Sequence, residues 1–212
     1  PPGAGKGTQA AIIARRTGVA RISTGEMLRD AIARKTPLGE QAAPLMNNGH
    51  LVPDSLLVAL IAERVTDPDC ANGLLLDGFP RTVPQARALD TMLAGKGLKL
   101  DAVVELMVDD ALLVDRIAGR FTCAKCKTGY HDTFKPTAKS GVCDACGSTE
   151  FTRRADDNRE TVAARLDEYH RQTAPILPHY RAQGIVRSVD GMAAIDEVAR
   201  QIDAVLARQT GG

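Results

Sequence analysis

The feature that most constrains this chain is its first octet, Pro1-Pro2-Gly3-Ala4-Gly5-Lys6-Gly7-Thr8, which leads into an apolar helical pattern. Glycines let a backbone curl until successive N–H groups point at one anion, and a helix that begins near Thr8 adds the positive end of its dipole. Lys6 would place a charge beside the β- and γ-phosphates of a nucleotide. The octet therefore predicts a nucleotide-binding loop. The alternative is a Gly-Pro turn with a surface lysine.

The octet departs from the common phosphate-loop pattern in two ways. That pattern begins with a glycine, which would precede Pro1, and it has Ser or Thr directly after the lysine, where Gly7 stands here. A loop of this type follows a buried strand, and a parallel sheet without that strand would lack its middle. We therefore expect a central strand ahead of Pro1, in a natural protein that is longer or numbered differently.

Composition favours one main domain with small insertions. The chain has 212 residues and 44% hydrophobic content, which can bury one sizeable core. The net charge of +1 gives no whole-protein argument for nucleic acid or an acidic membrane. No apolar run approaches the roughly 20 residues of a membrane span, and no signal-peptide pattern opens the chain. We expect a cytoplasmic protein with no nucleic-acid or membrane partner.

Strand and helix patterns alternate outside two insertions, which predicts an α/β fold with a central parallel β-sheet flanked by helices. One insertion, residues 23–65, is mostly helical, and the other, 121–153, is polar and carries cysteines. Hydroxyl residues ahead of Glu26 suggest an N-cap for a helical run there. Further helices are expected at 8–16, 38–48, 55–65, 84–93, 110–120, 158–170 and 194–208, and strands at 74–76, 102–108 and 185–189.

An acidic residue, Asp77, directly follows the apolar run Leu74-Leu75-Leu76. Phosphate-loop enzymes place a carboxylate near magnesium in this way, directly or through water. A buried strand followed by a turn is the alternative, but it leaves Arg81 without a role. Arg116 and Arg120, four apart, would share one face of the expected helix 110–120. That face is either solvated or, given the cysteine segment just beyond it, part of the site.

Four of the five cysteines form two Cys-x-x-Cys pairs, Cys123 with Cys126 and Cys143 with Cys146. Their spacing suits four thiolates that close tetrahedrally on a structural Zn²⁺. Two disulfides are the alternative, which an intracellular context disfavours, and iron could occupy the same sulfur site. Cys70 stands apart and is interpreted as an ordinary semi-buried thiol.

Three further motifs occur in order after the octet: Ser-Thr-Gly-Glu-Met-Leu-Arg at 23–29, Asp-Gly-Phe-Pro-Arg-Thr at 77–82 and Asp-Arg-Ile-Ala-Gly-Arg at 115–120. With them the chain resembles adenylate kinase in its long-lid bacterial form. The resemblance implies a P-loop nucleoside triphosphate hydrolase-like fold and reversible, Mg²⁺-dependent phosphoryl transfer from ATP to AMP, giving two ADP. It also implies a core of residues 1–22, 53–118 and 157–212, a monophosphate-binding subdomain of residues 23–52, and a zinc-bearing lid of residues 119–156.

The resemblance also implies roles for individual residues. The expected ATP contacts are Gly3, Ala4, Gly5, Lys6, Gly7, Thr8, Arg116, Tyr130 and Ala193. The expected AMP contacts are Thr24, Arg29, His50, Leu51, Val52, Gly78, Phe79, Pro80, Arg81, Gln85, Arg154 and Arg165. The cations expected to act in catalysis are Lys6, Arg81, Arg116, Arg120, Arg154 and Arg165, and magnesium would be held through water by Thr8 and Asp77. Glu26 stands where the family more often has aspartate, which puts no catalytic role in doubt.

Two rival functions stay open on sequence alone. One is a nucleoside monophosphate kinase for UMP, CMP or GMP, although Gln85 could pair with an adenine edge and so favours AMP. The other is a zinc-ribbon nucleic-acid-binding protein, which the near-neutral charge and the 3% aromatic content disfavour. His131 and His170 are interpreted as surface or structural residues. The family resemblance alone suggests a monomer.

Overall fold

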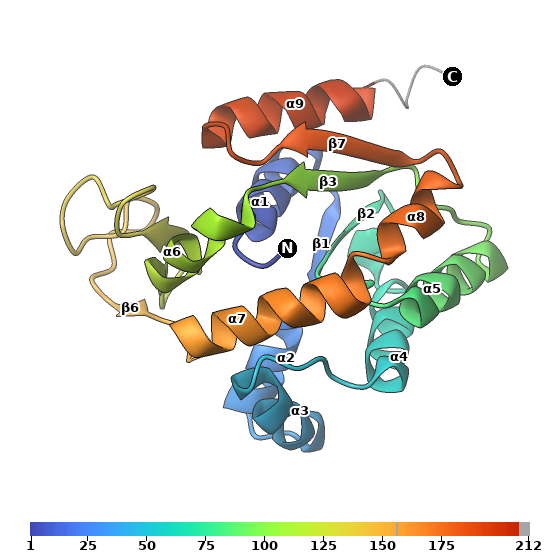
Figure 1. Ribbon diagram of the computed structural model, residues 1–212, viewed down its shortest axis with the longest axis horizontal. Helices are drawn as coiled ribbons and strands as arrows, with labels where there is room; N and C mark the ends of the chain where they lie inside the picture. Colours follow the sequence, from blue (N-terminus) through green and yellow to red (C-terminus); the bar gives the residue numbers. More distant parts are fainter. Residues whose placement is uncertain (156, 208–212) are drawn as a thin grey trace.

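The computed structural model describes residues 1–155 and 157–207 and has parallel strands covered by helices (Figure 1). Strand β1 (Ala20–Ser23) pairs in parallel with β2 (Leu74–Asp77), and β3 (Val103–Met107) pairs in parallel with β7 (Val186–Asp190). The strand runs are rich in Leu, Ile and Val, as expected for strands that helices cover. The α/β class predicted from the sequence is confirmed.

Helices connect and cover these strands. The longer ones are α1 (Lys6–Thr17), α4 (Asp54–Arg64), α5 (Val83–Gly95), α7 (Arg159–Glu168) and α9 (Ile195–Ala207). Shorter ones are α6 (Leu113–Ala118), α8 (Ile176–Arg181), the 3-10 turns Pro68–Cys70 and Asp110–Leu112, and a π-helical turn at Tyr169–Thr173. Pro84 lies in the first turn of α5, where its missing N–H costs no hydrogen bond. No helix in the described ranges is both long and apolar enough to span a bilayer.

The parallel strands among the described residues form two separate pairs, as expected for a parallel sheet that lacks its middle strand. No described strand joins β2 to β3 by hydrogen bonds. Side chains join the pairs instead, because Leu75 of β2 and Val104 of β3 pack in the same cluster as Ala4 and Ile13. A second cluster, around Ile22, packs β1 and β2 against α4 and α5.

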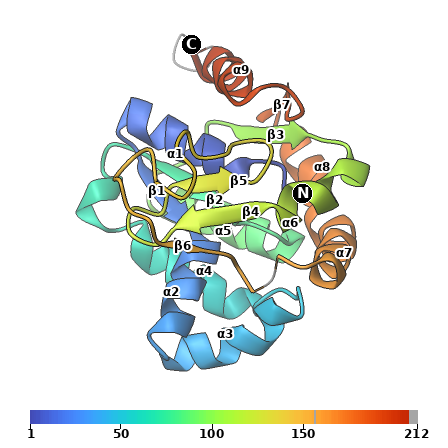
Figure 2. The same ribbon diagram turned by 90° about the vertical axis from the view of Figure 1, so that its left-hand side faces the viewer.

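Two projections flank the N-terminal loop in Figure 1. One is the helical pair α2 (Thr24–Ala33) and α3 (Pro37–Asn47). The other is an antiparallel sheet of order β5-β4-β6, which Figure 2 shows facing the viewer in front of the core. Its strands are β4 (Arg120–Cys123), β5 (Gly129–His131) and β6 (Phe151–Thr152).

Two sequence predictions are wrong in detail. Helix α6 ends at Ala118 and Arg120 begins β4, so Arg116 and Arg120 do not share a helical face. The chain changes direction at Gly119, where an added Cβ would lie 2.5 Å from the His131 ring, so only glycine fits this contact. Strand β1 was not predicted, because its four residues precede the helix directly. The last residue of the expected closing helix, Arg208, lies outside the described residues.

Candidate functional site

The N-terminal loop has the backbone of an anion-binding turn. Gly3 and Gly5 have φ values of 79° and 89°, in the left-handed region that glycine adopts without strain. Gly5 is the N-cap of α1 and offers no side chain to the helix, so the N–H groups of the first turn are left for another acceptor. A Cβ on Gly3 would lie 2.8 Å from Ile117, so packing, as well as backbone conformation, requires glycine at this position.

Lys6 lies within a group of cations. Desolvation, followed by the charge of Arg81, lowers the pKa of Lys6 to about 8, and Arg165 and Arg120 act in the same direction. Lys6 keeps an exposed surface. Asp77 is the carboxylate that opposes them. The four cations thus converge from α1, β4, α7 and the turn after β2.

One buried carboxylate, Asp157, holds two of these arginines. Its side chain is 3% exposed. Arg120 Nε donates to Asp157 Oδ2 over 2.8 Å, and Arg165 Nη1 donates to Oδ1 over 3.4 Å. A carboxylate that accepts from two guanidinium groups fixes their positions while leaving the trio with a net positive charge. No sequence motif marks this residue.

The carboxylate of Asp77 lies at the carboxyl end of β2, beside the N-terminal loop. Its Oδ2 accepts from Arg21 Nη2 over 3.0 Å and is 3.4 Å from where a Cβ on Gly7 would lie. The Asp77 carboxylate and the hydroxyl of Thr8, in the first turns of α1, are hard oxygen ligands of the kind that Mg²⁺ prefers. These donors fit the magnesium role that the sequence predicted for them.

The turn after β2 is organised around the carbonyl of Gly78, a residue with a φ of 84°. This oxygen accepts from Thr24 Oγ1 and from Arg81 Nε, both over 2.8 Å. The Phe79–Pro80 peptide within the turn is cis. The two hydrogen bonds connect α2 to the turn and orient the Arg81 guanidinium.

Asp54, in the first turn of α4, holds the start of α5. Its carboxylate accepts from Thr82 Oγ1 over 2.8 Å and from Gln85 Nε2 over 2.6 Å. Gln85 is fully buried, and its Oε1 accepts from the Arg81 N–H over 2.7 Å. Both ends of the Gln85 amide are therefore already hydrogen-bonded, so a contact with adenine would use the remaining N–H of its Nε2 or exchange a partner.

The other residues expected to contact AMP lie along α2 and after α3. The Arg29 guanidinium folds over Gly25, since its nitrogens are 3.3 Å from where a Cβ on Gly25 would lie. His50, Leu51 and Val52 form the connection between α3 and α4, and Val52 is buried. Val52 packs in the same hydrophobic cluster as Phe79 of the Gly78 turn.

On the opposite side, Arg116 links α6 to the turn after β7. Its Nη1 donates to the Gly191 carbonyl over 3.1 Å, two residues before Ala193, and its guanidinium lies 5.5 Å from the centre of the Phe134 ring. Tyr130 is buried inside the antiparallel sheet module, and its hydroxyl accepts from the Asp144 N–H over 2.8 Å. Any contact of Tyr130 with a nucleotide would therefore use its backbone.

The four paired cysteines come together as the sequence predicted. Their sulfurs all lie within 4.8 Å of one another, with 3.6 Å between Cys123 and Cys146 and 3.5 Å between Cys126 and Cys143. Four thiolates at a Zn–S distance of about 2.3 Å are about 3.8 Å apart in a tetrahedron, so the cluster fits a zinc ion. Cys70 is buried at a distant place, where its Sγ accepts from Arg64 over 3.1 Å.

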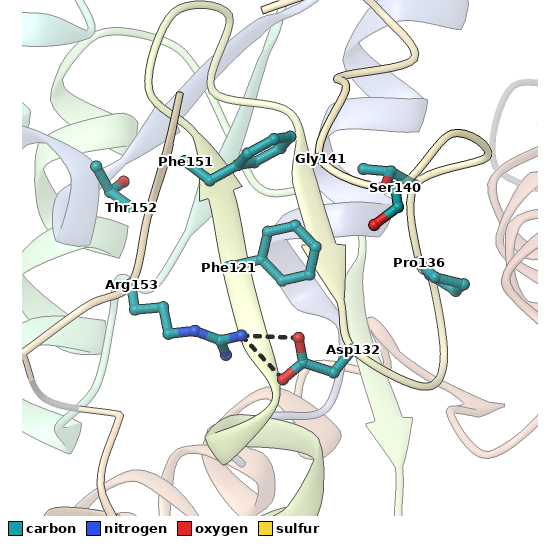
Figure 3. A pocket seen from close by; sticks show the side chains of 9 residues that line it. Phe121, Asp132, Pro136, Ser140, Gly141, Phe151, Thr152 and Arg153 are labelled. Carbon is teal, nitrogen blue, oxygen red and sulfur yellow. Dashed lines mark hydrogen bonds and ion pairs between the residues drawn. The ribbon is translucent and has the colours of Figure 1, made fainter. Parts of the chain in front are cut away.

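The cysteine-bearing module has its own small core and a surface cavity. Phe121, Tyr130 and Phe151 pack against one another with ring centroids 5.3 to 5.8 Å apart. The cavity, of about 370 Å³, is lined by Phe121, Phe151 and the Asp132–Arg153 ion pair, which Figure 3 shows below the two rings. None of the expected nucleotide contacts lines it.

Comparison with known proteins decides the family. A family sequence model described as Adenylate kinase matches residues 1–185. An adenylate kinase of Rhizobium rhizogenes is 53% identical over 208 residues, which are 98% of this chain and 96% of the relative. An adenylate kinase of Zymomonas mobilis is 54% identical over 206 residues, which are 97% of this chain and 92% of the relative. The chain belongs to the adenylate kinase family.

Membership in the adenylate kinase family confirms the predicted fold class and reaction. The chain is a P-loop phosphotransferase that moves the terminal phosphoryl group of ATP to AMP, and adenylate kinases use Mg²⁺ together with ATP. Among the expected catalytic residues, Lys6, Arg81, Arg120 and Arg165 lie close enough for their charges to interact. Arg154 follows β6 at the edge of the cysteine-bearing module, and Arg116 lies on the side of Gly191.

Sequence reasoning missed three residues that organise this adenylate kinase site: Arg21, Asp54 and Asp157. Asp54 could have been suspected, because an acidic residue directly after Pro53 marks the first turn of a helix. Arg21 and Asp157 carry no sequence signal of their own. They are identified by their contacts with Asp77 and with Arg120, which join distant parts of the chain.

Proposed function

We propose that the residues above divide the ATP and AMP sites of this phosphotransferase between the two sides of the N-terminal loop. On the ATP side, the N–H groups of residues 3–8 and Lys6 would hold the phosphates, and Arg116 would stack on the adenine. The left-handed glycines and the uncapped start of α1 support this role. Tyr130 and Ala193 would add backbone contacts.

AMP would bind between α2 and the Gly78 turn. Its phosphate would be gripped by Arg29 and Arg81, and its base would lie against Gln85 and the backbone of residues 50–52. The observation that carries this proposal is the pair of hydrogen bonds by which the Gly78 carbonyl orients Arg81 and Thr24. Arginine suits the position because its planar fork can bind two phosphate oxygens at once.

In the reaction, an oxygen of the AMP phosphate would attack the γ-phosphorus of ATP, and the bond from that phosphorus to the β–γ bridging oxygen would break. Each product is then ADP. The transition state is loose and highly charged, so the protein has to position and neutralise more than it has to react covalently. Lys6, Arg81, Arg120, Arg154 and Arg165 would supply the positive charge, and no side-chain nucleophile is required.

Two metal ions complete the proposal. Thr8 and Asp77 would hold Mg²⁺ through water, and the ion supplies charge neutralisation at the β- and γ-phosphates when bound. The four cysteines would hold a structural Zn²⁺, since their thiolates would fill all four coordination positions and leave none for a reacting water. The zinc would stabilise a module whose aromatic core is only three rings.

We propose three functional units: a core of residues 1–22, 53–118 and 157–212, a monophosphate-binding subdomain of residues 23–52, and a lid of residues 119–156. Closure of the two smaller units would exclude water, which otherwise competes with AMP as acceptor. We also propose a monomer that acts in the cytoplasm. Size-exclusion chromatography with light scattering should give the mass of one chain, and a larger mass would overturn the monomer.

Replacement of Arg81 by Ala tests the proposed site. It should lower kcat by about 10²- to 10³-fold, because one preorganised charge at the transferred group is lost. Arg87→Ala, on the exposed face of the same helix α5, is the matched control and should leave kcat unchanged. Circular dichroism should show both variants folded. Intact turnover in Arg81→Ala would reject the role given to this arginine.

A further inference from the structure

Arg21, on β1, bridges two carboxylates at the start of the nucleotide site. Its Nη2 donates to Asp77 Oδ2 over 3.0 Å and to Glu26 Oε1 over 2.7 Å, and its Nη1 reaches Glu26 Oε2 over 3.4 Å. In the parallel register of β1 and β2, Arg21 lies opposite Leu75 and Ser23 lies opposite Asp77. The Arg21 side chain therefore extends along the sheet to reach Asp77 at the end of β2. The contact therefore depends on the fold and not on neighbouring sequence.

This bridge touches the N-terminal loop itself. A Cβ on Gly7 would lie 3.4 Å from Asp77 Oδ2 and 3.5 Å from Arg21 Nη2. The guanidinium is thus a fixed cation beside the very carboxylate oxygen that faces the phosphate loop. None of the roles assigned above uses it.

Burial makes the arrangement sensitive to charge. The side chains of Asp77 and Arg21 are 11% and 21% exposed, whereas Glu26 is 50% exposed. Arg21 Nε is buried and has no hydrogen-bond partner among the described residues, so the guanidinium depends on its two carboxylates for compensation. Desolvation lowers the pKa of Arg21, but the hydrogen bonds to Asp77 and then Glu26 outweigh it and raise the pKa overall.

We propose that Arg21 and Glu26 act together as a charge-balanced clamp that orients Asp77 and sets how strongly Mg²⁺ favours nucleotide binding. The proposal rests on the magnesium role given above to Asp77. Arg21 alone would repel a divalent cation near Asp77, and Glu26 cancels that charge. The trio keeps the net charge of one carboxylate, but the carboxylate that faces the phosphate loop is held in place. Arg21 and Glu26 are positioning residues, because they act through Asp77.

The test compares binding of the non-hydrolysable β,γ-imido analogue of ATP with Mg²⁺ and with EDTA by calorimetry. The dissociation constant measured in EDTA, divided by the one measured with Mg²⁺, gives the factor by which Mg²⁺ strengthens binding, without any turnover. Glu26→Gln leaves the charge of Arg21 uncompensated and should lower this ratio by about three- to tenfold. This is the effect expected when one unit charge repels a divalent ion at a dielectric constant close to that of water. Arg21→Gln should raise the ratio by a similar factor, and the double variant should return close to the parent value.

The ion pair of Asp30 and Arg34, exposed on the same helical projection, supplies matched controls. Asp30→Asn and Arg34→Gln make the same charge changes and should leave the ratio unchanged. Shifts of the same sign in Glu26→Gln and Arg21→Gln, or no shift beyond these controls, would overturn the clamp. Because Glu26 is exposed, Glu26→Gln decides the matter even if Arg21→Gln does not fold.

Asp77→Asn distinguishes failure of the clamp from failure of the magnesium role of Asp77, on which the clamp rests. A lowered ratio in Asp77→Asn with unchanged ratios in Glu26→Gln and Arg21→Gln would reject the clamp alone. An unchanged ratio in Asp77→Asn would reject the magnesium role of Asp77 and the clamp with it.

Discussion

Asp157→Asn is the substitution that most sharply tests how Arg120 and Arg165, the arginines proposed to act on the phosphates, are held. Removing one partner of a fully buried ion pair costs about 3–5 kcal/mol. Here the side chains of Arg120 and Arg165 stay 24% and 19% exposed, so solvent compensates them in part. Because Asn can still accept one hydrogen bond, we expect a loss of about 2 kcal/mol in unfolding free energy, or about 4–8 °C in Tm.

The same substitution should affect turnover more than substrate binding. Without the carboxylate, Arg120 and Arg165 keep their charge but lose their fixed positions, so kcat should fall by about 10- to 10²-fold while KM changes less. Steady-state kinetics and calorimetry on the same preparation measure both effects. Asp132→Asn, which breaks the exposed pair with Arg153, is the control and should cost less than about 1 kcal/mol. If Asp157→Asn behaved like this control in stability and in kcat, the reasoning would be refuted.

Two further predictions concern the metal and the loop lysine. Cys143→Ser should abolish the bound zinc measured by mass spectrometry and lower the Tm of the cysteine-bearing module, whereas Cys70→Ser should keep the zinc; retained zinc in Cys143→Ser would contradict the four-thiolate site. Binding of ATP should take up protons at pH 8.5, because the pKa of Lys6, lowered to about 8, rises again beside the triphosphate, and affinity should therefore fall as pH rises through 8. Calorimetry in two buffers of different ionisation enthalpy measures this uptake, and the same uptake in Lys6→Met would show that another group is responsible.

The parts of the site that local sequence patterns encode could be predicted without the structure. The glycines and Lys6 of the first octet, the position of Asp77 after an apolar run, and the two cysteine pairs depend on residues close in sequence. Each is where the pattern indicated. The roles of these residues in binding stay predictions.

The remaining parts depend on contacts between distant segments, which one sequence does not reveal. Arg21 is 56 positions from Asp77, and Arg120 is 37 positions from Asp157. The spacing of Arg116 and Arg120 predicts a helix that continues to Arg120, but tertiary pairing with β5 draws that residue into a strand. Strand β1 was not predicted because its sequence, Ala-Arg-Ile-Ser, holds no apolar run and leads directly into a helix, whereas β2, of the same length, begins with three leucines.

The central claim is that this chain transfers the terminal phosphoryl group of ATP to AMP, with the Gly78 turn and Gln85 selecting the acceptor. The most direct test is the initial rate of nucleoside diphosphate formation from Mg-ATP with AMP, GMP, CMP or UMP as acceptor. The account predicts rapid formation of ADP with AMP and little product with the other three. Comparable rates with another acceptor would contradict the selection by Gln85, and no product with any acceptor would contradict the claim itself.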